Sequence, residues 1–272
     1  MISNSSPSAA PDWNVSKPTI SCIVCAYNEA DKISRILSVI SGHPLLSEVI
    51  VVNDGSTDET DAVLSTFSNL TVLSYTENRG KTYALSQGIA RANGDYVLLL
   101  DADLSGVTAD DICDLVEPVL AGWADTSLSL RRNSLAIYRM IGLDFVSGER
   151  LIPLTLVEPH LNQMAALPRW GGEVFLNRLI TSAAVSIAVV RWTGVYNIRK
   201  SEKVGWLKGS LEELFMIADV FRVLTPWQVL TQNVQMLRQK VRPPKTYLAG
   251  AKPIAARFMA RVDPAASWQK SA

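Results

Sequence analysis

Two aspartates, Asp101 and Asp103, end the apolar run YVLLLDADLS at residues 96–105. Residues two apart in an extended segment point to the same side, so we expect both carboxylates on one side of the chain. Oxygen ligands of this kind suit a hard divalent cation, Mg²⁺ or Mn²⁺, that in turn binds diphosphate oxygens. The pair therefore predicts a metal site. The alternative is that the two aspartates cap a helix that begins near Thr108.

The elements that must position this pair are visible as short apolar runs. Four runs rich in Val, Ile and Leu predict strands covered on both faces, at residues 20–25, 48–53, 70–75 and 96–100. Helical spacing of apolar residues falls between them, at Ile33, Ile36, Leu37 and Ile40 and again at Leu85, Gly88, Ile89 and Ala92. Ser56 and Glu59 have the spacing of a capping box and predict where a further helix starts.

This alternation predicts an α/β fold: a mostly parallel sheet with helices on both faces. Such sheets bind ligands outside the carboxyl ends of their strands, and polar residues follow all four predicted strands. They are Asn28 and Glu29 after the first, Asp54 and Ser56 after the second, Glu77 to Lys81 after the third, and Asp101 and Asp103 after the fourth. We expect these groups to share one edge of the sheet.

Composition limits the class of protein. With 272 residues and 48% hydrophobic content, the chain can bury one sizeable core. Lys plus Arg and Asp plus Glu both number 26, which argues against nucleic acid as the partner. Cys22 and Cys25 lie three apart in a predicted strand, so they should point to opposite faces and form no disulfide, and a zinc site is poorly supported. With three cysteines and no apolar leader, a cytoplasmic location is expected.

Four blocks, CAYNEADKI, VVNDGSTDET, NRGKTYALSQGIARANGDYVLLLDADLS and FVSGERLIP, resemble the family 2 glycosyltransferases of GT-A fold, especially the dolichyl- and polyprenyl-phosphate sugar synthases. The resemblance covers residues 19–150. It implies a Rossmann-like sheet and a metal-dependent, inverting enzyme of hexosyltransferase type. Its donor would be a UDP- or GDP-linked sugar and its acceptor a polyprenyl phosphate or other lipid-linked group. The alternatives are transfer to a hydroxyl of a small soluble acceptor, or a catalytically silent nucleotide-binding protein.

The resemblance also assigns residues on the donor side. Asp54 would contact the nucleotide base, Gly80 and Lys81 would close over the nucleotide, and Asp103 would be the more direct metal ligand of the Asp101, Ala102, Asp103 triplet. The segment Ala26, Tyr27, Asn28 and Glu29 would lie beside the nucleoside. Independently of any family, Lys81 near a diphosphate makes sense as a point charge on phosphate oxygens, against the alternative of a solvated lysine at a helix start.

The second half supplies acceptor residues. A strand is expected at residues 124–131 and a helix at 134–145. By resemblance, Arg131 and Arg150 would hold an acceptor phosphate, and Glu173 in WGGEVFLNRLI would face the active site. Glu173 would be a general base for a hydroxyl acceptor or would position the arginines for a phosphate. Some related nucleotide-sugar enzymes bind the metal with a histidine from a loop in the second half. The corresponding segment here, RWTGVYNIRK, has no histidine, and Asn197 is the nearest polar substitute.

Four segments are expected along the chain. Residues 1–18 would be flexible, 19–205 the GT-A domain with a nucleotide-sugar half (19–122) and an acceptor half (123–205), 206–242 a helical appendage, and 243–272 an extended tail. No run reaches about 18 uninterrupted apolar residues. The apolar stretch 211–237, bordered by cationic residues, predicts a helix that either lies at a membrane interface, peripherally on the cytoplasmic face, or packs on the core. The sequence predicts no oligomeric state.

Overall fold

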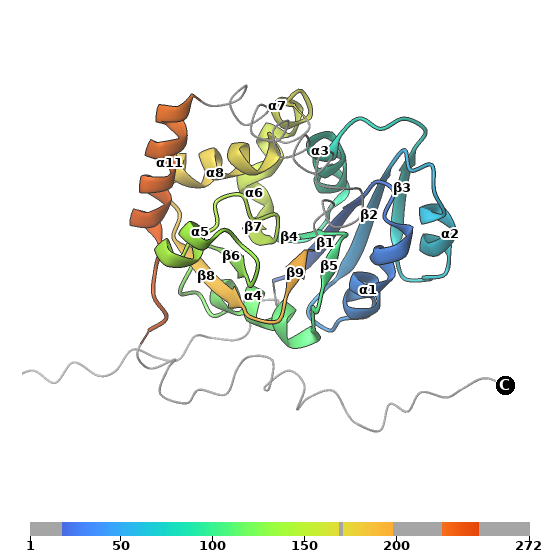
Figure 1. Cartoon of the computed structure of the whole chain (residues 1–272), viewed down its shortest axis with the longest axis horizontal. Coiled ribbons are helices and arrows are strands. Elements are labelled where there is room, and N and C mark those ends of the chain that lie inside the picture. The colour runs from blue at the N-terminus through green and yellow to red at the C-terminus, as the bar shows by residue number, and fades with distance from the viewer. Residues whose placement is uncertain (1–17, 169–170, 198–224, 245–272) are drawn as a thin grey trace, which may run out of the picture.

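The computed structural model describes residues 18–168, 171–197 and 225–244, and its centre is a seven-stranded sheet (Figure 1). The strand order across the sheet is β3-β2-β1-β4-β7-β6-β8. The strands are β1 (Ile20–Ala26), β2 (Glu48–Asp54), β3 (Thr71–Tyr75), β4 (Tyr96–Asp101), β6 (Thr126–Arg131), β7 (Arg150–Pro153) and β8 (Ile187–Trp192). A separate two-stranded ribbon pairs β5 (Leu104–Ser105) with β9 (Tyr196–Asn197).

The sheet is mostly parallel. β1 pairs in parallel with β2 and with β4, β2 with β3, and β6 with β8, whereas β7 runs antiparallel between β4 and β6. The register sets Ala26 of β1 beside Asn53 of β2, and Cys25 beside Asp101 of β4. The carboxyl ends of β1, β2 and β4 therefore lie at one edge of the sheet, and the predicted α/β fold is confirmed.

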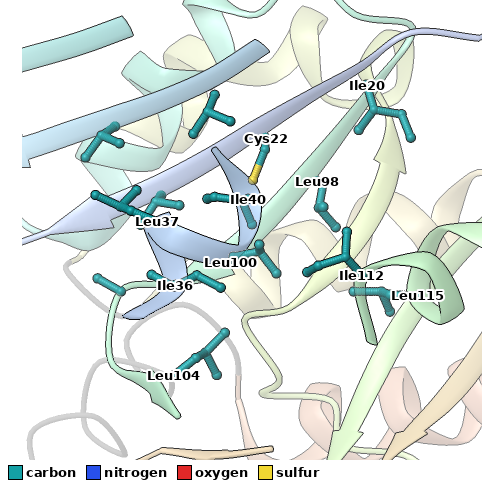
Figure 2. Close-up of a cluster of buried hydrophobic side chains, with 14 of the residues drawn as sticks. Ile20, Cys22, Ile36, Leu37, Ile40, Leu98, Leu100, Leu104, Ile112 and Leu115 are labelled. Atoms are coloured by element: carbon teal, nitrogen blue, oxygen red, sulfur yellow. The ribbon is translucent and has the colours of Figure 1, made fainter. Parts of the chain in front are cut away.

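Helices cover both faces of the sheet (Figure 1). They are α1 (Ala30–Ile40), α2 (Thr60–Ser65), α3 (Lys81–Arg91), α4 (Ala109–Leu120), α5 (Ala136–Ile141), α6 (Leu154–Val157), a 3-10 turn (Glu158–His160), α7 (Leu161–Ala165), α8 (Gly172–Ser182) and α11 (Pro226–Gln239). Apolar residues of α1 and α4 pack on one face, as Figure 2 shows for Ile36, Leu37, Ile112 and Leu115. Those of α3 and α8 pack on the other face.

Strand alternation divides the side chains between the two cores. Cys22 packs with Leu98 and the α1 side chains, whereas Ile23, the next residue, packs with the α3 side chains (Figure 2 shows Cys22). Cys25 packs against the same core as Ile23. Cys22 and Cys25 thus lie on opposite faces of β1, as their spacing predicts.

Two local predictions were wrong in detail. Ser56 and Glu59 form no capping box: the Ser56 hydroxyl accepts the Asn28 backbone N–H at 2.9 Å, and α2 begins at Thr60, whose N–H donates to Asp58 Oδ1 at 3.1 Å. The helix expected at 134–145 is only Ala136–Ile141, because Gly142 adopts a left-handed φ of 70° and ends it.

Several expected segments lie outside the described residues. These are the N-terminal segment up to residue 17, residues 198–224 and the tail from residue 245. The apolar stretch 211–237 is therefore described only from residue 225 onward, where it contains most of α11. Within the described part of the chain, no helix has both the length and the apolar character needed to cross a bilayer.

Candidate active site

The two aspartates of the opening motif lie at the centre of a charged cluster at the carboxyl edge of the sheet. Asp101 is the last residue of β4, and its Oδ1 accepts a hydrogen bond from Lys81 Nζ at 2.8 Å. The same Lys81 Nζ donates to Glu173 Oε1 at 2.6 Å. Arg131 approaches the other oxygen of Asp101, with Nη1 3.7 Å from Oδ2. Side chains from four separate elements thus form one cluster, in which Glu173 is linked to Asp101 through Lys81.

The pKa values in this cluster follow from burial and charge together. Burial alone would lower the pKa of Lys81, but the carboxylates of Asp101 and Glu173 raise it above its ordinary value. Burial would raise the pKa of Asp101, but Lys81 and Arg131 hold it below its ordinary value. Lys81 and Asp101 are therefore both charged at neutral pH.

Asp103 has a different environment. Its Oδ1 accepts a hydrogen bond from Asn197 Nδ2 at 3.1 Å. Burial, followed by the negative charges of Asp101 and Glu29, raises the pKa of Asp103 to about 7. Asp103 is therefore a carboxylate that a nearby cation would stabilise in its charged form.

The capping alternative for the two aspartates is excluded by the start of α4. Thr108 is the N-cap residue, and its hydroxyl accepts the Asp111 N–H at 3.2 Å while the Asp111 carboxylate accepts the Thr108 N–H at 2.9 Å. The helix has its own capping box, so Asp101 and Asp103 make no contribution to it.

The donor set fits a divalent cation. The cluster holds four carboxylates (Asp101, Asp103, Glu149 and Glu173) and two cations (Lys81 and Arg131), an excess of two negative charges when all are ionised. Among the described residues, no three His, Cys, Asp or Glu side chains form a ready-made metal cluster. The protein would thus supply up to two carboxylates and leave the other positions for phosphate and water oxygens, as Mg²⁺ prefers.

The predicted nucleoside side is built by two loops that hold each other. Asn28 has a left-handed φ of 55°, and its Oδ1 accepts the Thr57 N–H at 2.8 Å. Asp54 is buried, and its two oxygens accept the N–H groups of Arg79 at 2.9 Å and Gly80 at 2.7 Å. Asp54 thereby fixes the loop that ends at Lys81, while its contact with a base stays a prediction.

The remaining donor-side residues differ in exposure. Ala26 and Ala102 are buried, so only their backbone can face a ligand, whereas Tyr27 is 38% exposed. Glu29 forms an ion pair with Lys32 at 2.5 Å and lies close enough to raise the pKa of Asp103. The structure thus brings Glu29 into the neighbourhood of the aspartate pair.

On the acceptor side, Arg131 is the guanidinium that reaches the cluster. Its Nη1 donates to Glu149 Oε1 at 2.8 Å and to Asn197 Oδ1 at 2.7 Å. Arg150 is different: it is fully buried, donates to Asn177 Oδ1 at 2.9 Å and also donates to the Ser147 carbonyl. Burial lowers the pKa of Arg150. Direct contact between Arg150 and an acceptor phosphate would require it to leave these partners, so that role stays a prediction.

Glu173 reaches the cluster from the first turn of α8. The start of this helix is tied to the start of α3, because the Gly172 N–H donates to the Thr82 hydroxyl at 3.0 Å. This contact holds Glu173 against Lys81, the first residue of α3. Glu173 is therefore brought together with Asp101 through one lysine.

The sequence interpretation gave no role to Glu149, which is fully buried beside Arg131. Glu149 lies two residues before Leu151, and both are buried. A carboxylate at a buried position of a strand end needs a cationic or hydrogen-bonding partner, and that signal could have identified it.

A mostly parallel sheet of GT-A type with an aspartate pair at its carboxyl edge is an arrangement that can bind a phosphorylated ligand through a divalent cation. Residues 21–144 match the family model "Glycosyl transferase family 2". This part of the chain is thus similar to the family 2 glycosyltransferases.

Curated relatives match over a similar region. Poly-beta-1,6-N-acetyl-D-glucosamine synthase of Staphylococcus aureus (strain MSSA476) is 40% identical over 98 residues, which cover 34% of this chain and 24% of the relative. The Staphylococcus epidermidis synthase is 38% identical over 88 residues, 31% of this chain and 21% of the relative. The match thus spans about a quarter of the length of these relatives.

Solved structures match over more of the chain. Glucosyl-3-phosphoglycerate synthase from Mycobacterium tuberculosis, in complex with Mn²⁺, UDP and glucosyl-3-phosphoglycerate, has a TM-score of 0.59 and 25% identity. The match covers 76% of this chain and 80% of that one. A further structure, described as a mycobacterial protein, has a TM-score of 0.60 and 22% identity over 75% of this chain and 74% of that one. Both support the GT-A fold.

Proposed function

We propose that the protein is a metal-dependent glycosyltransferase that takes a sugar from a nucleotide diphosphate donor, with UDP or GDP as the nucleotide. The observation that carries the proposal is the aspartate pair in a cluster with two excess negative charges, at the ligand-binding edge of a GT-A sheet. The mycobacterial synthase of similar fold, crystallised with Mn²⁺ and UDP, supports the donor class and the metal.

Three side chains of the cluster would act on the donor. Asp101 and Asp103 would hold Mg²⁺ or Mn²⁺, which supplies Lewis-acid stabilisation of the departing diphosphate. Lys81 would place a positive charge on phosphate oxygens when it exchanges one of its two carboxylate partners for the donor. Asp54 fixes the loop that ends at Lys81, and this loop would hold the lysine within reach of the phosphate oxygens.

For the acceptor, we propose a polyprenyl phosphate or another lipid-linked phosphate, with inversion at the anomeric carbon. Arg131 supports this choice, since its guanidinium borders Asp101 and guanidinium groups bind phosphate through paired hydrogen bonds. A phosphate oxygen is already ionised and needs no general base. Glu173 would then only position Lys81.

A hydroxyl acceptor is the second candidate, and Glu173 favours it. The carboxylate is within hydrogen-bond distance of Lys81 and close to Asp101, where an acceptor hydroxyl would need a base. The matched synthases, named for poly-N-acetylglucosamine and for glucosyl-3-phosphoglycerate, support it as well. Glu173→Gln discriminates the two: turnover would be abolished with donor affinity unchanged for a hydroxyl acceptor, and largely retained for a phosphate.

A peripheral contact with the cytoplasmic face of a membrane is part of this proposal. α11 carries an exposed apolar stripe, Trp227, Leu230 and Val234, opposite the side where Met236 packs on the core. α11 contains no acidic residue, and Arg238 lies in its last turn. An apolar stripe with cationic neighbours suits a surface that carries anionic lipids.

The experiment that tests the proposal is a thermal-shift series with UDP, GDP, CDP and dTDP, each with and without Mn²⁺. A ligand that binds only the native state raises stability, so one nucleotide should raise the Tm only with the metal. Asp103→Ala should lose that increase. If no nucleotide stabilises the wild type at saturating concentration, the proposal fails. Metal-dependent hydrolysis of the matching nucleotide sugar would then distinguish an active enzyme from a silent nucleotide-binding protein.

A further inference from the structure

Glu149 is a buried carboxylate next to Arg131, the guanidinium that borders Asp101. It is fully buried: Oε2 accepts from Ser129 Oγ at 2.7 Å and Ser147 Oγ at 2.8 Å, and Oε1 accepts from Arg131 Nη1 at 2.8 Å. Its carboxyl group also contacts that of Asp101 directly. A buried charge is costly unless it is paired, and here the pairing cation is Arg131. The two hydroxyls fix the direction in which the carboxylate can face.

Arg131 lies between two carboxylates that compete for it. Its Nη1 has two N–H groups, and Glu149 Oε1 and Asn197 Oδ1 accept from that nitrogen at 2.8 and 2.7 Å. Asp101 Oδ2 is 3.7 Å from the same nitrogen, too far for a hydrogen bond. The positive charge of Arg131 therefore stabilises the Asp101 carboxylate, but Asp101 accepts no hydrogen bond from Nη1.

The backbone next to Glu149, at Gly148, also lies close to Asp101. A Cβ atom at Gly148 would lie 2.5 Å from Asp101 Oδ1, so any larger residue there would displace the Asp101 carboxylate. The segment that carries Glu149 is thereby set in direct contact with Asp101, and a change in Glu149 would be felt at Asp101 through both the backbone and Arg131.

We infer that Glu149 is a positioning residue that holds Arg131 away from Asp101 and so keeps the Asp101 carboxylate available to a divalent cation. The inference rests on the proposed function, because the cation is the one that the proposal assigns to Asp101 and Asp103. Without the charge of Glu149, the nearest carboxylate to Arg131 Nη1 is Asp101. Arg131 would then form a direct ion pair with Asp101 and compete with the metal.

The test is the affinity of the folded protein for Mn²⁺ in the presence of UDP, measured by calorimetric titration. Glu149→Gln keeps the size of the side chain and removes its charge, and it should raise the Kd for Mn²⁺ about tenfold, as loss of an outer-shell partner does. Glu149→Asp keeps the charge and should give a smaller rise. Glu48→Gln is the matched control, since Glu48 accepts from Ser21 Oγ at 2.6 Å at the opposite end of the sheet, and it should leave the Kd unchanged.

A double-mutant comparison separates positioning from a merely structural role. In an Arg131→Gln background no guanidinium remains to compete for Asp101, and only the direct contact between Glu149 and Asp101 is left, so adding Glu149→Gln should change the Kd much less than it does in the wild type. An equal loss of Mn²⁺ affinity in both backgrounds, or an unchanged Kd in folded Glu149→Gln, overturns the inference. If Glu149→Gln does not fold, an unchanged Kd in Glu149→Asp overturns it. Absence of Mn²⁺ and UDP binding by the wild type would instead overturn the proposed function and the inference with it.

Discussion

Lys81 is the residue whose environment has the most direct chemical consequence. One ammonium group forms ion pairs with two carboxylates from different elements, Asp101 on β4 and Glu173 on α8. Without it, those carboxylates would repel each other at the edge of the sheet. A divalent cation and Lys81 therefore act on the same excess of negative charge, and the loss of one should increase the need for the other.

Replacing Lys81 tests this relation. Lys81→Met should lower the free energy of unfolding by about 2 kcal/mol in metal-free buffer, since it removes the shared partner of two half-buried carboxylates. Saturating Mn²⁺ should recover part of that loss by binding the freed carboxylates, and denaturant titrations with and without Mn²⁺ measure both effects. Lys240→Met, which removes a bond to the Gly142 carbonyl far from these acids, should show no such recovery. An equal loss with and without the metal would contradict the prediction.

At the scale of elements, the order of strands and helices could be predicted because apolar periodicity reports burial directly. The position of Asp101 and Asp103 at the edge of the sheet could be predicted for the same reason, since they follow an apolar strand at its carboxyl end, while their binding of a metal stays a prediction. The partner of Glu149 could not be predicted, because Arg131 is 18 residues away and only the antiparallel pairing of β6 with β7 brings the two together. Likewise, the local sequence predicts that Ser56 caps a helix, but its hydroxyl accepts a hydrogen bond from Asn28, in the loop after β1.

Gly55 is the point where two of these loops meet. It has a left-handed φ of 72°, and a Cβ there would lie 2.5 Å from the backbone N of Asn78. Gly55→Ala should therefore displace the loop that Asp54 holds, costing about 3 kcal/mol of stability and weakening UDP binding, as denaturation and calorimetry would measure. Gly122→Ala is the matched control, because Gly122 has a φ of 73° with nothing within 4 Å, and it should cost only about 1 kcal/mol. Equal costs for the two would show that the loop contact has no effect.

For the molecule as a whole, charge gives no general attraction to a membrane. Lys plus Arg equal Asp plus Glu at 26 each, so any recruitment must come from a local surface. The exposed stripe of α11 is such a surface. Its cationic neighbours include Arg238 in the last turn of the helix and Lys240 just beyond it, whose pKa is lowered by burial and by the nearby charges of Arg191 and Arg242. The positive charges gathered around Lys240 favour an anionic partner.

Binding to vesicles tests this surface on the full chain. We expect sedimentation with vesicles that contain anionic lipid, and a loss of about tenfold in binding for Trp227→Ser with Leu230→Ser, since each removes exposed apolar area that would enter the lipid interface. Val72→Ser is the matched control: Val72 is equally apolar and 40% exposed, but it lies on β3 at the far edge of the sheet. Neither change touches the aspartate cluster, so the Mn²⁺-dependent stabilisation by UDP should persist in both. Unchanged vesicle binding in the α11 variant would leave the apolar stripe without a membrane role, while the sugar-transfer proposal would stand on the metal and nucleotide measurements.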